Sequence, residues 1–184
     1  MYTSNTLIPA GIVTSDIEIF YDTSREDVYF FQDGVKQHWT DLPASVKRKV
    51  MDLLTEDISR LIRNVFNVHK EADITSVFLK CRFGNLDYVA DIASCGKISF
   101  DAPHCNQLLK CKGFGKICNV PANLTRMEYI ITREVSTGKL IKEIADQMIL
   151  SEATIRTHIQ RVHRKTNCNN NVELSAWAHK LKIV

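Results

Sequence analysis

Apolar side chains recur with a helical period along residues 124–184, and capping residues punctuate the pattern. Thr125 and Glu128 form a capping box for a first helix, and Gly138 suits the left-handed position that ends it. A second helix is predicted from the spacing of Ile141, Ile144, Ala145 and Met148. A third helix is predicted over residues 151–165, with Ser151 as its cap. Asn170 and Glu173 form a capping box for a fourth helix, which contains Leu174, Ala176, Trp177 and Leu181. The pattern predicts an all-α domain of four short helices over residues 124–184.

The preceding part of the chain reads differently, as an α+β domain over residues 1–100. Short strands are predicted within residues 17–39, where Asp33 and Gly34 supply the positive φ angles of a tight hairpin turn. A helical period follows Pro43 and extends to Phe66, either unbroken or with one break near Thr55. Residues 74–100 are expected to form short strands and loops, and residues 101–123 a linker that carries cysteines.

The predicted third helix, residues 151–165, has two distinct faces. At 100° per residue, Ile155, Ile159 and Val162 fall in one narrow apolar stripe. Polar and basic side chains occupy the other side, with Arg156 at its margin: Thr157, Gln160, Arg161 and Arg164. An ordinary solvated surface helix would show the same division, but such helices usually mix charges, and this face has almost no acid beyond Glu152. The pattern therefore favours a helix that anchors on one side and meets a polyanion on the other.

Several short motifs of this region occur in a familiar order: Leu124-Thr-Arg-Met-Glu128, Gly138, Lys142-Glu-Ile-Ala145, Ser151-Glu-Ala-Thr-Ile155, His158 and Arg164-Lys165. Together they resemble the LuxR-type (GerE-like) helix-turn-helix domain, over residues 124–184. The resemblance implies a DNA-binding transcriptional regulator whose third helix enters the major groove. It also implies that the fourth helix forms a dimer contact.

The resemblance also implies roles for individual residues. By position, Arg156, Thr157 and Gln160 are expected to read bases, whereas phosphate contacts are expected at Lys142, Thr154, Arg161, Arg164 and Lys165. His158 matches a histidine beside the DNA backbone, or else packs on its neighbours. Trp177 and Leu181 are expected at the dimer contact, because a domain this small covers a large indole poorly; the alternative is that Trp177 belongs to the core. Leu140 departs from the polar cap usual for the second helix.

Charge supports this division of the chain. Residues 124–184 hold 10 Lys/Arg against 6 Asp/Glu, whereas residues 1–123 hold 14 against 15. The excess positive charge thus lies where a polyanion is expected. No apolar stretch is long enough to span a bilayer and no secretory leader is evident, so we expect a cytoplasmic protein without a membrane partner.

Six cysteines raise the question of metal or thiol chemistry. Cys105, Cys111 and Cys118 could hold zinc with a fourth ligand from Cys95, Cys81 or His104; the alternative is a set of reduced thiols. No cofactor is expected, with zinc as the alternative. A metal- or thiol-responsive sensor that uses these cysteines is accordingly a second hypothesis for the function.

The α+β domain offers no enzyme chemistry. We find neither the acidic cluster of a receiver domain nor a nucleophile with a base, and Asp87, Asp91 and Asp101 are expected to be loop acids that face solvent or form turns. We therefore expect a regulator and not an enzyme, with duplex DNA, a second copy of the chain and RNA polymerase as partners. A helix-turn-helix scaffold used only for protein interaction is the third hypothesis.

Overall fold

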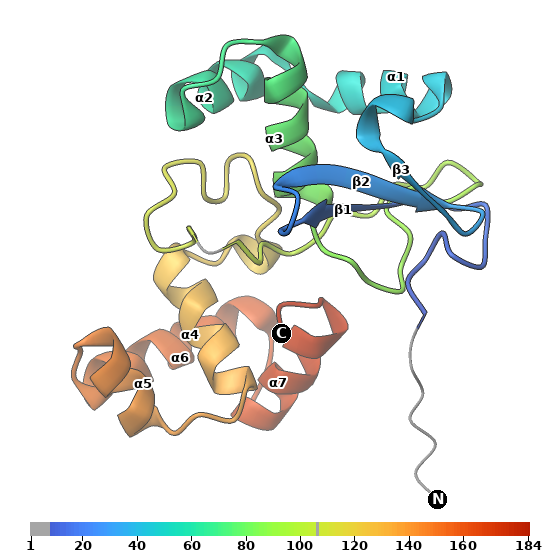
Figure 1. Cartoon of the computed structure of the whole chain (residues 1–184). Helices are drawn as coiled ribbons and strands as arrows, with labels where there is room; N and C mark the ends of the chain where they lie inside the picture. The colour runs from blue at the N-terminus through green and yellow to red at the C-terminus, as the bar shows by residue number, and fades with distance from the viewer. Residues whose placement is uncertain (1–7, 106) are drawn as a thin grey trace, which may run out of the picture. The chain divides into compact units, whose positions relative to one another are not determined.

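The structure is a computed structural model that describes residues 8–105 and 107–184 (Figure 1). It divides into two compact units, residues 1–101 and residues 102–184. The first unit combines a three-stranded sheet with helices, and the second is helical. This confirms the predicted fold class, an α+β region followed by an all-α region.

The sheet of the first unit is an antiparallel meander. Strand β1 (Glu18–Asp22) pairs with β2 (Asp27–Gln32), and β2 pairs with β3 (Val35–His38). The turn between β2 and β3 places Asp33 at φ 50° and Gly34 at φ 78°, as the Asp-Gly pair predicted. One face of the sheet is fully buried through Ile19, Val28 and Phe30.

Two consecutive helices follow the sheet, α1 (Ala44–Leu53) and α2 (Glu56–Phe66). They are separate because the chain breaks at Thr55, whose hydroxyl caps α2 by accepting from the amide of Ile58. A 3₁₀ turn, η1 (Trp39–Asp41), precedes Pro43, which stands at the N-cap of α1. Of the two possibilities left by the sequence, the structure has the broken helix.

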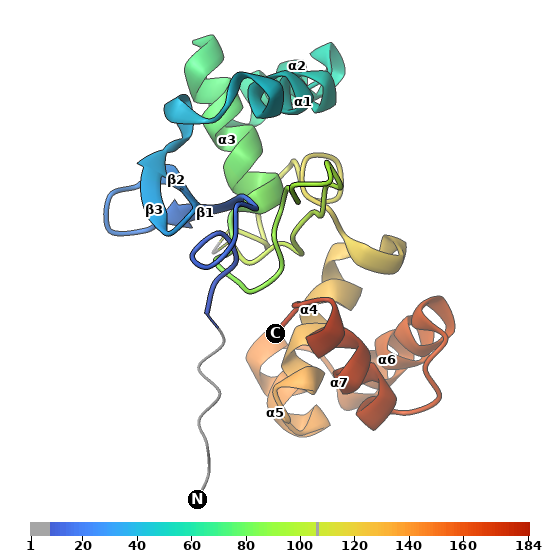
Figure 2. The same cartoon turned by 90° about the vertical axis from the view of Figure 1, so that its right-hand side faces the viewer.

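The expectation of short strands and loops from residue 74 onward is wrong for its first part, because residues 71–83 form helix α3 (Glu71–Phe83). Most of its large apolar side chains are β-branched or aromatic and favour strands locally, but Ile74, Phe78 and Phe83 are buried. Helix α3 packs on β1 and β2 and on α2 (Figures 1 and 2). This packing outweighs the local preference.

Residues 84–101 do form loops and isolated bridges, held to the sheet by buried carboxylates. Oδ2 of Asp91 accepts from the amide of Ile19 at 2.7 Å, and Oε1 of Glu18 accepts from the amide of Asp87 at 2.7 Å. Asp91 and Asp101 are 1% and 7% exposed, so the expectation that these acids face solvent is wrong, whereas Oδ1 of Asp87 accepts from the amide of Val89 at 2.7 Å, as in the turn that was the alternative. Burial, and then the charges of Asp101 and Glu18, raise the pKa of Asp91 well above its usual range.

The second unit contains four helices where the sequence predicted them: α4 (Arg126–Ser136), α5 (Ile141–Met148), α6 (Glu152–Thr166) and α7 (Asn171–Lys180). A 3₁₀ turn, η2 (Pro121–Asn123), precedes them. The capping box of Thr125 and Glu128 is formed, with the Glu128 carboxylate 2.7 Å from the amide of Thr125. At Leu140 the side chain supplies no cap, but Glu143 accepts from the Leu140 amide at 2.8 Å.

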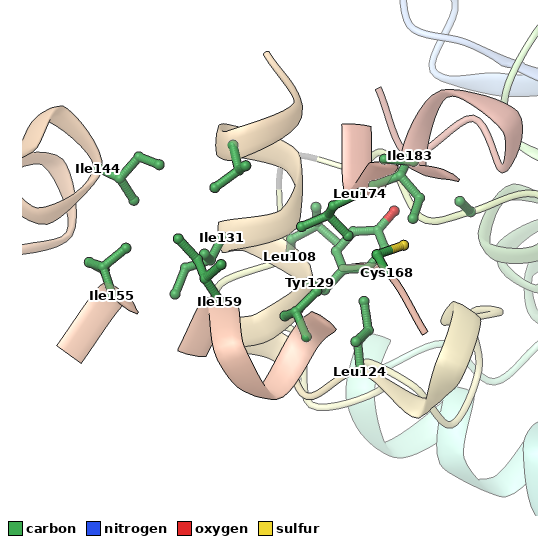
Figure 3. Close-up of a cluster of buried hydrophobic side chains, with 14 of the residues drawn as sticks. Leu108, Leu124, Tyr129, Ile131, Ile144, Ile155, Ile159, Cys168, Leu174 and Ile183 are labelled. Atoms are coloured by element: carbon green, nitrogen blue, oxygen red, sulfur yellow. The ribbon is translucent and has the colours of Figure 1, made fainter. Parts of the chain in front are cut away.

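The helices of the second unit enclose one apolar core (Figure 3). Tyr129, fully buried on α4, lies at its centre with Leu124, Leu174 and Cys168 around it. Ala102 and Leu108 belong to the same core, so the segment expected to be a linker is packed against the helices at these points. The hydroxyl of Tyr129 donates to the carbonyl of Pro103 at 2.8 Å, which fixes the entry of this segment.

Candidate nucleic-acid interface

Helix α6 is anchored in the core of the second unit by the apolar stripe that the sequence predicted. Ile155 and Val162 are fully buried, and Ile159 is 6% exposed. Ser151 caps the helix by accepting from the amide of Thr154 at 3.1 Å. Because the stripe fixes the rotation of α6 about its axis, the opposite face points into solvent.

The exposed face of α6 carries donors and cations. Arg156, Thr157 and Gln160, the three predicted base readers, are all exposed and lie within two turns of one another. Nη2 of Arg156 lies 3.2 Å from Oε2 of Glu152, and the Thr157 hydroxyl donates to the Ala153 carbonyl at 2.9 Å. An exposed pair of this kind contributes only about 0.3–0.5 kcal/mol, so Arg156 is easily released to another partner.

The predicted phosphate contacts do not share one environment. Arg161 and Arg164 are exposed on α6, and Lys142 is exposed in the first turn of α5. The hydroxyl of Thr154 lies 2.8 Å from that of Ser151, within the cap of the helix. The accessible cations are therefore Arg161, Arg164 and Lys142, whereas the Thr154 hydroxyl also takes part in the N-terminal cap of α6.

Lys165 is already engaged within the unit. Its ammonium donates to Oε2 of Glu128 at 2.6 Å and to the carbonyl of Asn123 at 3.1 Å. Burial raises the pKa of Glu128, but the hydrogen bonds from Lys165 and Thr125 outweigh it, and the pKa lies below its usual range. Lys165 thus ties the last turn of α6 to the first turn of α4, a role that the sequence pattern did not reveal.

The flanking histidines of α6 are half-buried. Nε2 of His163 lies 3.1 Å from Oδ1 of Asn171, which links α6 to the start of α7. Nδ1 of His158 is buried without a hydrogen-bond partner among the described residues. The packing role considered for His158 thus accounts for the position of its ring but not for this nitrogen.

Helix α7 presents a different apolar surface from the one that the sequence suggested. Trp177 is partly buried and packs on the core, while Leu181, just after the helix, is 37% exposed. Val172 is 80% exposed, and Ala176 lies exposed one turn later on the same face. A shallow hollow beside this face is lined by Val135, Ser136, Gly138, Lys139, Asn171, Val172, Ser175 and Ala176. The i, i+4 spacing of Val172 and Ala176 was the feature of the sequence that could have indicated this exposed face.

The cysteines do not form a metal centre in the part of the chain that the structure describes, where no three His, Cys, Asp or Glu side chains are grouped to bind an ion. Cys81 and Cys95 lie in the first unit, and the other cysteines lie in the second. Burial raises the pKa of the Cys118 thiol, and the nearby thiols of Cys105 and Cys111 raise it further. The described residues thus give the zinc alternative no support.

The boundary between the units sharpens the charge division. Residues 102–184 hold 13 Lys/Arg against 6 Asp/Glu, a net charge of +7, whereas residues 1–101 hold 11 against 15, a net charge of −4. The cationic unit is therefore the one that contains the exposed face of α6.

Among the described residues, no helix is both long and apolar enough to cross a membrane.

Comparison with protein families agrees with this location. Residues 122–178 match the GerE family model, described as bacterial regulatory proteins of the luxR family. Neither the curated proteins nor the solved structures gave a match. The matched segment contains all of α4, α5 and α6 and most of α7. Residues 122–178 are therefore similar to the LuxR-type helix-turn-helix domain, which supports a DNA-binding transcription regulator.

Proposed function

We propose that this chain is a transcriptional regulator that binds duplex DNA in a sequence-specific manner, with α6 in the major groove. The observation that carries the proposal is the pairing of a buried stripe on α6 with an exposed face of donors and cations. The major groove admits one helix and displays a distinct pattern of donors and acceptors for each base pair. A helix fixed by Ile155 and Val162 presents its outer face to such a groove without further rearrangement.

Within this proposal Arg156, Thr157 and Gln160 read base edges. Arg donates two parallel hydrogen bonds to guanine, and Gln both donates to and accepts from adenine. Arg161, Arg164 and Lys142 contact phosphates, with the hydroxyl of Thr154 beside them. We leave Lys165 out of the phosphate set, because its ammonium already bonds to Glu128 and to the carbonyl of Asn123.

Base reading is tested on a binding site selected from a randomised duplex library by the full chain. Arg156→Ala and Gln160→Ala are each expected to weaken binding to that site by about 5- to 150-fold, the equivalent of about 1–3 kcal/mol. Their binding to a mixed-sequence duplex should change much less. Lys47→Ala, at an exposed cation of the first unit, is the control. The base-reading assignment fails if both variants bind the selected site as tightly as the parent.

Phosphate contacts make a different prediction. Arg161→Gln and Arg164→Gln should weaken binding to selected and mixed-sequence duplexes alike. Each should lower the slope of log K against log salt by about 0.9, because one fewer counterion is released. A loss confined to the selected site would instead make that arginine a base reader.

We further propose that two copies bind DNA together through α7, with half-sites about one helical turn apart. The candidate apolar surfaces for this contact are the exposed pair Val172 and Ala176 on one side of α7, and Leu181 beside the partly buried Trp177 on another side. Val172→Asp should abolish cooperative binding to a duplex with two half-sites if the first surface forms the contact, with the monomer still folded because the side chain is 80% exposed. Val13→Asp, at a 68% exposed position of the first unit, is the matched control. Unchanged cooperativity in Val172→Asp would remove the side of α7 that carries Val172 and Ala176 from the dimer contact.

A further inference from the structure

The second unit carries a basic surface outside the four helices, in the segment before them. The sequence contains no Asp or Glu between Asp101 and Glu128. Within this stretch we define the basic segment as residues 107–118, which contains Lys110, Lys112 and Lys116. All three lysines are exposed, and none forms an ion pair with a described acidic side chain.

The basic segment is a folded part of the unit and not a loose strand. Successive turns close it, with the amides of Lys110 and Cys111 both donating to the Gln107 carbonyl and the amides of Lys116 and Ile117 both donating to the Gly113 carbonyl. Leu108 and Ile117 are buried beneath the turns. A Cβ on Gly113 would lie 2.5 Å from Cδ1 of Ile117, so a larger residue at this position would force the Ile117 side chain to shift.

Arg126, in the first turn of α4, holds the basic segment to the helices. Its guanidinium donates to the carbonyl of Leu109 at 3.0 Å and also to the carbonyl of Cys111. The same guanidinium lies over the ring of Phe114, which in turn meets the ring of Tyr129 edge-on. These contacts fix the backbone on either side of Lys110, so that the lysines project from a rigid frame.

Two consecutive contacts connect this frame to the end of α6. Arg126 joins the basic segment to the first turn of α4, and Lys165 joins that turn to the last turn of α6 through Glu128. The basic segment and the C-terminal end of α6 therefore both contact the first turn of α4.

We infer that Lys110, Lys112 and Lys116 bind the phosphate backbone of duplex DNA beside the groove that α6 occupies. This inference rests on the proposed DNA binding and extends the contact surface beyond the helix-turn-helix segment. The occupant is duplex DNA because the surface is cationic, lacks acids to neutralise it, and continues from the cationic end of α6. Lysines positioned in this way strengthen binding to every sequence and carry no base preference.

The test compares two triple variants of the full chain by fluorescence anisotropy with a 30-base-pair duplex of mixed sequence. The first is Lys110→Gln/Lys112→Gln/Lys116→Gln. The matched control is Lys47→Gln/Arg48→Gln/Lys70→Gln, which removes the same charge from exposed positions of the first unit. We expect the first variant to bind more weakly and to flatten the slope of log K against log salt by about 2–3, while the control keeps the slope of the parent. Circular dichroism melting checks that both variants stay folded.

Each other outcome overturns the inference in a recognisable way. An unchanged salt slope in the first variant means that these lysines do not meet phosphate, even if α6 binds DNA. Equal flattening in both variants means that only net charge matters. Altered self-association with an unchanged slope assigns the lysines to an acidic protein surface. If the parent shows no salt-dependent duplex binding, the proposed function itself fails, and this inference fails with it.

Discussion

The two units of the chain differ in net charge and in the surroundings of their buried carboxylates. The first unit has a net charge of −4 and buries Glu18, Asp91 and Asp101, while the second has a net charge of +7 and buries Glu128. Burial, and then the charges of Asp101 and Glu18, raise the pKa of Asp91, whereas the carboxylate of Glu128 is paired with the ammonium of Lys165. Exposed cations then gather on the surface of the second unit, in α6 and in the basic segment. The difference supports the proposal that the second unit binds a polyanion.

The largest expected effect is the destabilisation of the second unit alone by a substitution in its apolar core. Tyr129→Ala removes a fully buried ring and should lower the free energy of unfolding of the second unit by about 3–5 kcal/mol. The chain has two tryptophans, Trp39 in the first unit and Trp177 in the second, so each unit has its own fluorescence reporter. Urea unfolding in Trp39→Phe and Trp177→Phe backgrounds measures each transition separately.

Tyr129→Phe is the control for this prediction, because it removes only the hydroxyl bonded to Pro103 and should cost about 1 kcal/mol. Equal shifts of both transitions in Tyr129→Ala would show that the units unfold as one body. That result would contradict the description of the two units as separately stable.

A smaller effect is expected from the tie between α6 and α4. Lys165→Met leaves the buried Glu128 without its cation and should destabilise the second unit by about 1–2 kcal/mol at neutral pH. This is a modest effect for a buried carboxylate, because the Lys165 side chain is about one third exposed and water screens the pair. In the parent, the lowered pKa of Glu128 gives stability above pH 4.5 that is lost as the pH falls through the folded pKa.

This pH dependence should weaken in the variant. Without Lys165, only the hydrogen bonds from Thr125 oppose the effect of burial on Glu128, so the pKa should rise and less stability should be lost as the pH falls below 4.5. Chemical unfolding of parent and Lys165→Met at several pH values between 3 and 7 measures the difference. Parallel pH profiles would show that Lys165 does not control the carboxylate.

The smallest effect concerns the acidic unit. Because the pKa of Asp91 is raised, its ionisation opposes folding, and the first unit loses stability as the pH rises from 3.8 through the folded pKa. Asp91→Asn retains an acceptor for the amide of Ile19 and removes the charge. It should therefore stabilise the first unit at pH 7 and have little effect near pH 4. A variant less stable than the parent at pH 7 would mean that the charge itself is needed.

The same contrast explains what the sequence could predict. The helices of the second unit follow from local signals, since Thr125, Ser151 and Asn170 each cap the helix that follows. The exposed face of α6 follows from the stripe of Ile155, Ile159 and Val162, because a helix fixed on one side exposes the other.

What the sequence did not predict depends on contacts between distant residues. Helix α3 is rich in strand-favouring residues and is stabilised by packing on the sheet; the acids of its first turn, Glu71 and Asp73, were the available signal. The roles of Lys165 and Asp91 depend on partners 37 and 72 positions away in the chain. Trp177 reaches the core because α7 packs on α4, which no local pattern specifies.

The central claim is that the second unit, through α6 and the basic segment, is the surface that binds duplex DNA. Its most direct test is a titration of the ¹⁵N-labelled full chain with the mixed-sequence duplex, followed by amide chemical shifts. We expect shifts to concentrate in residues 107–127, in the first turn of α5 around Lys142 and in residues 152–166, with the amides of residues 8–101 unchanged. Shifts confined to the first unit, or none at all at low salt, would contradict the account.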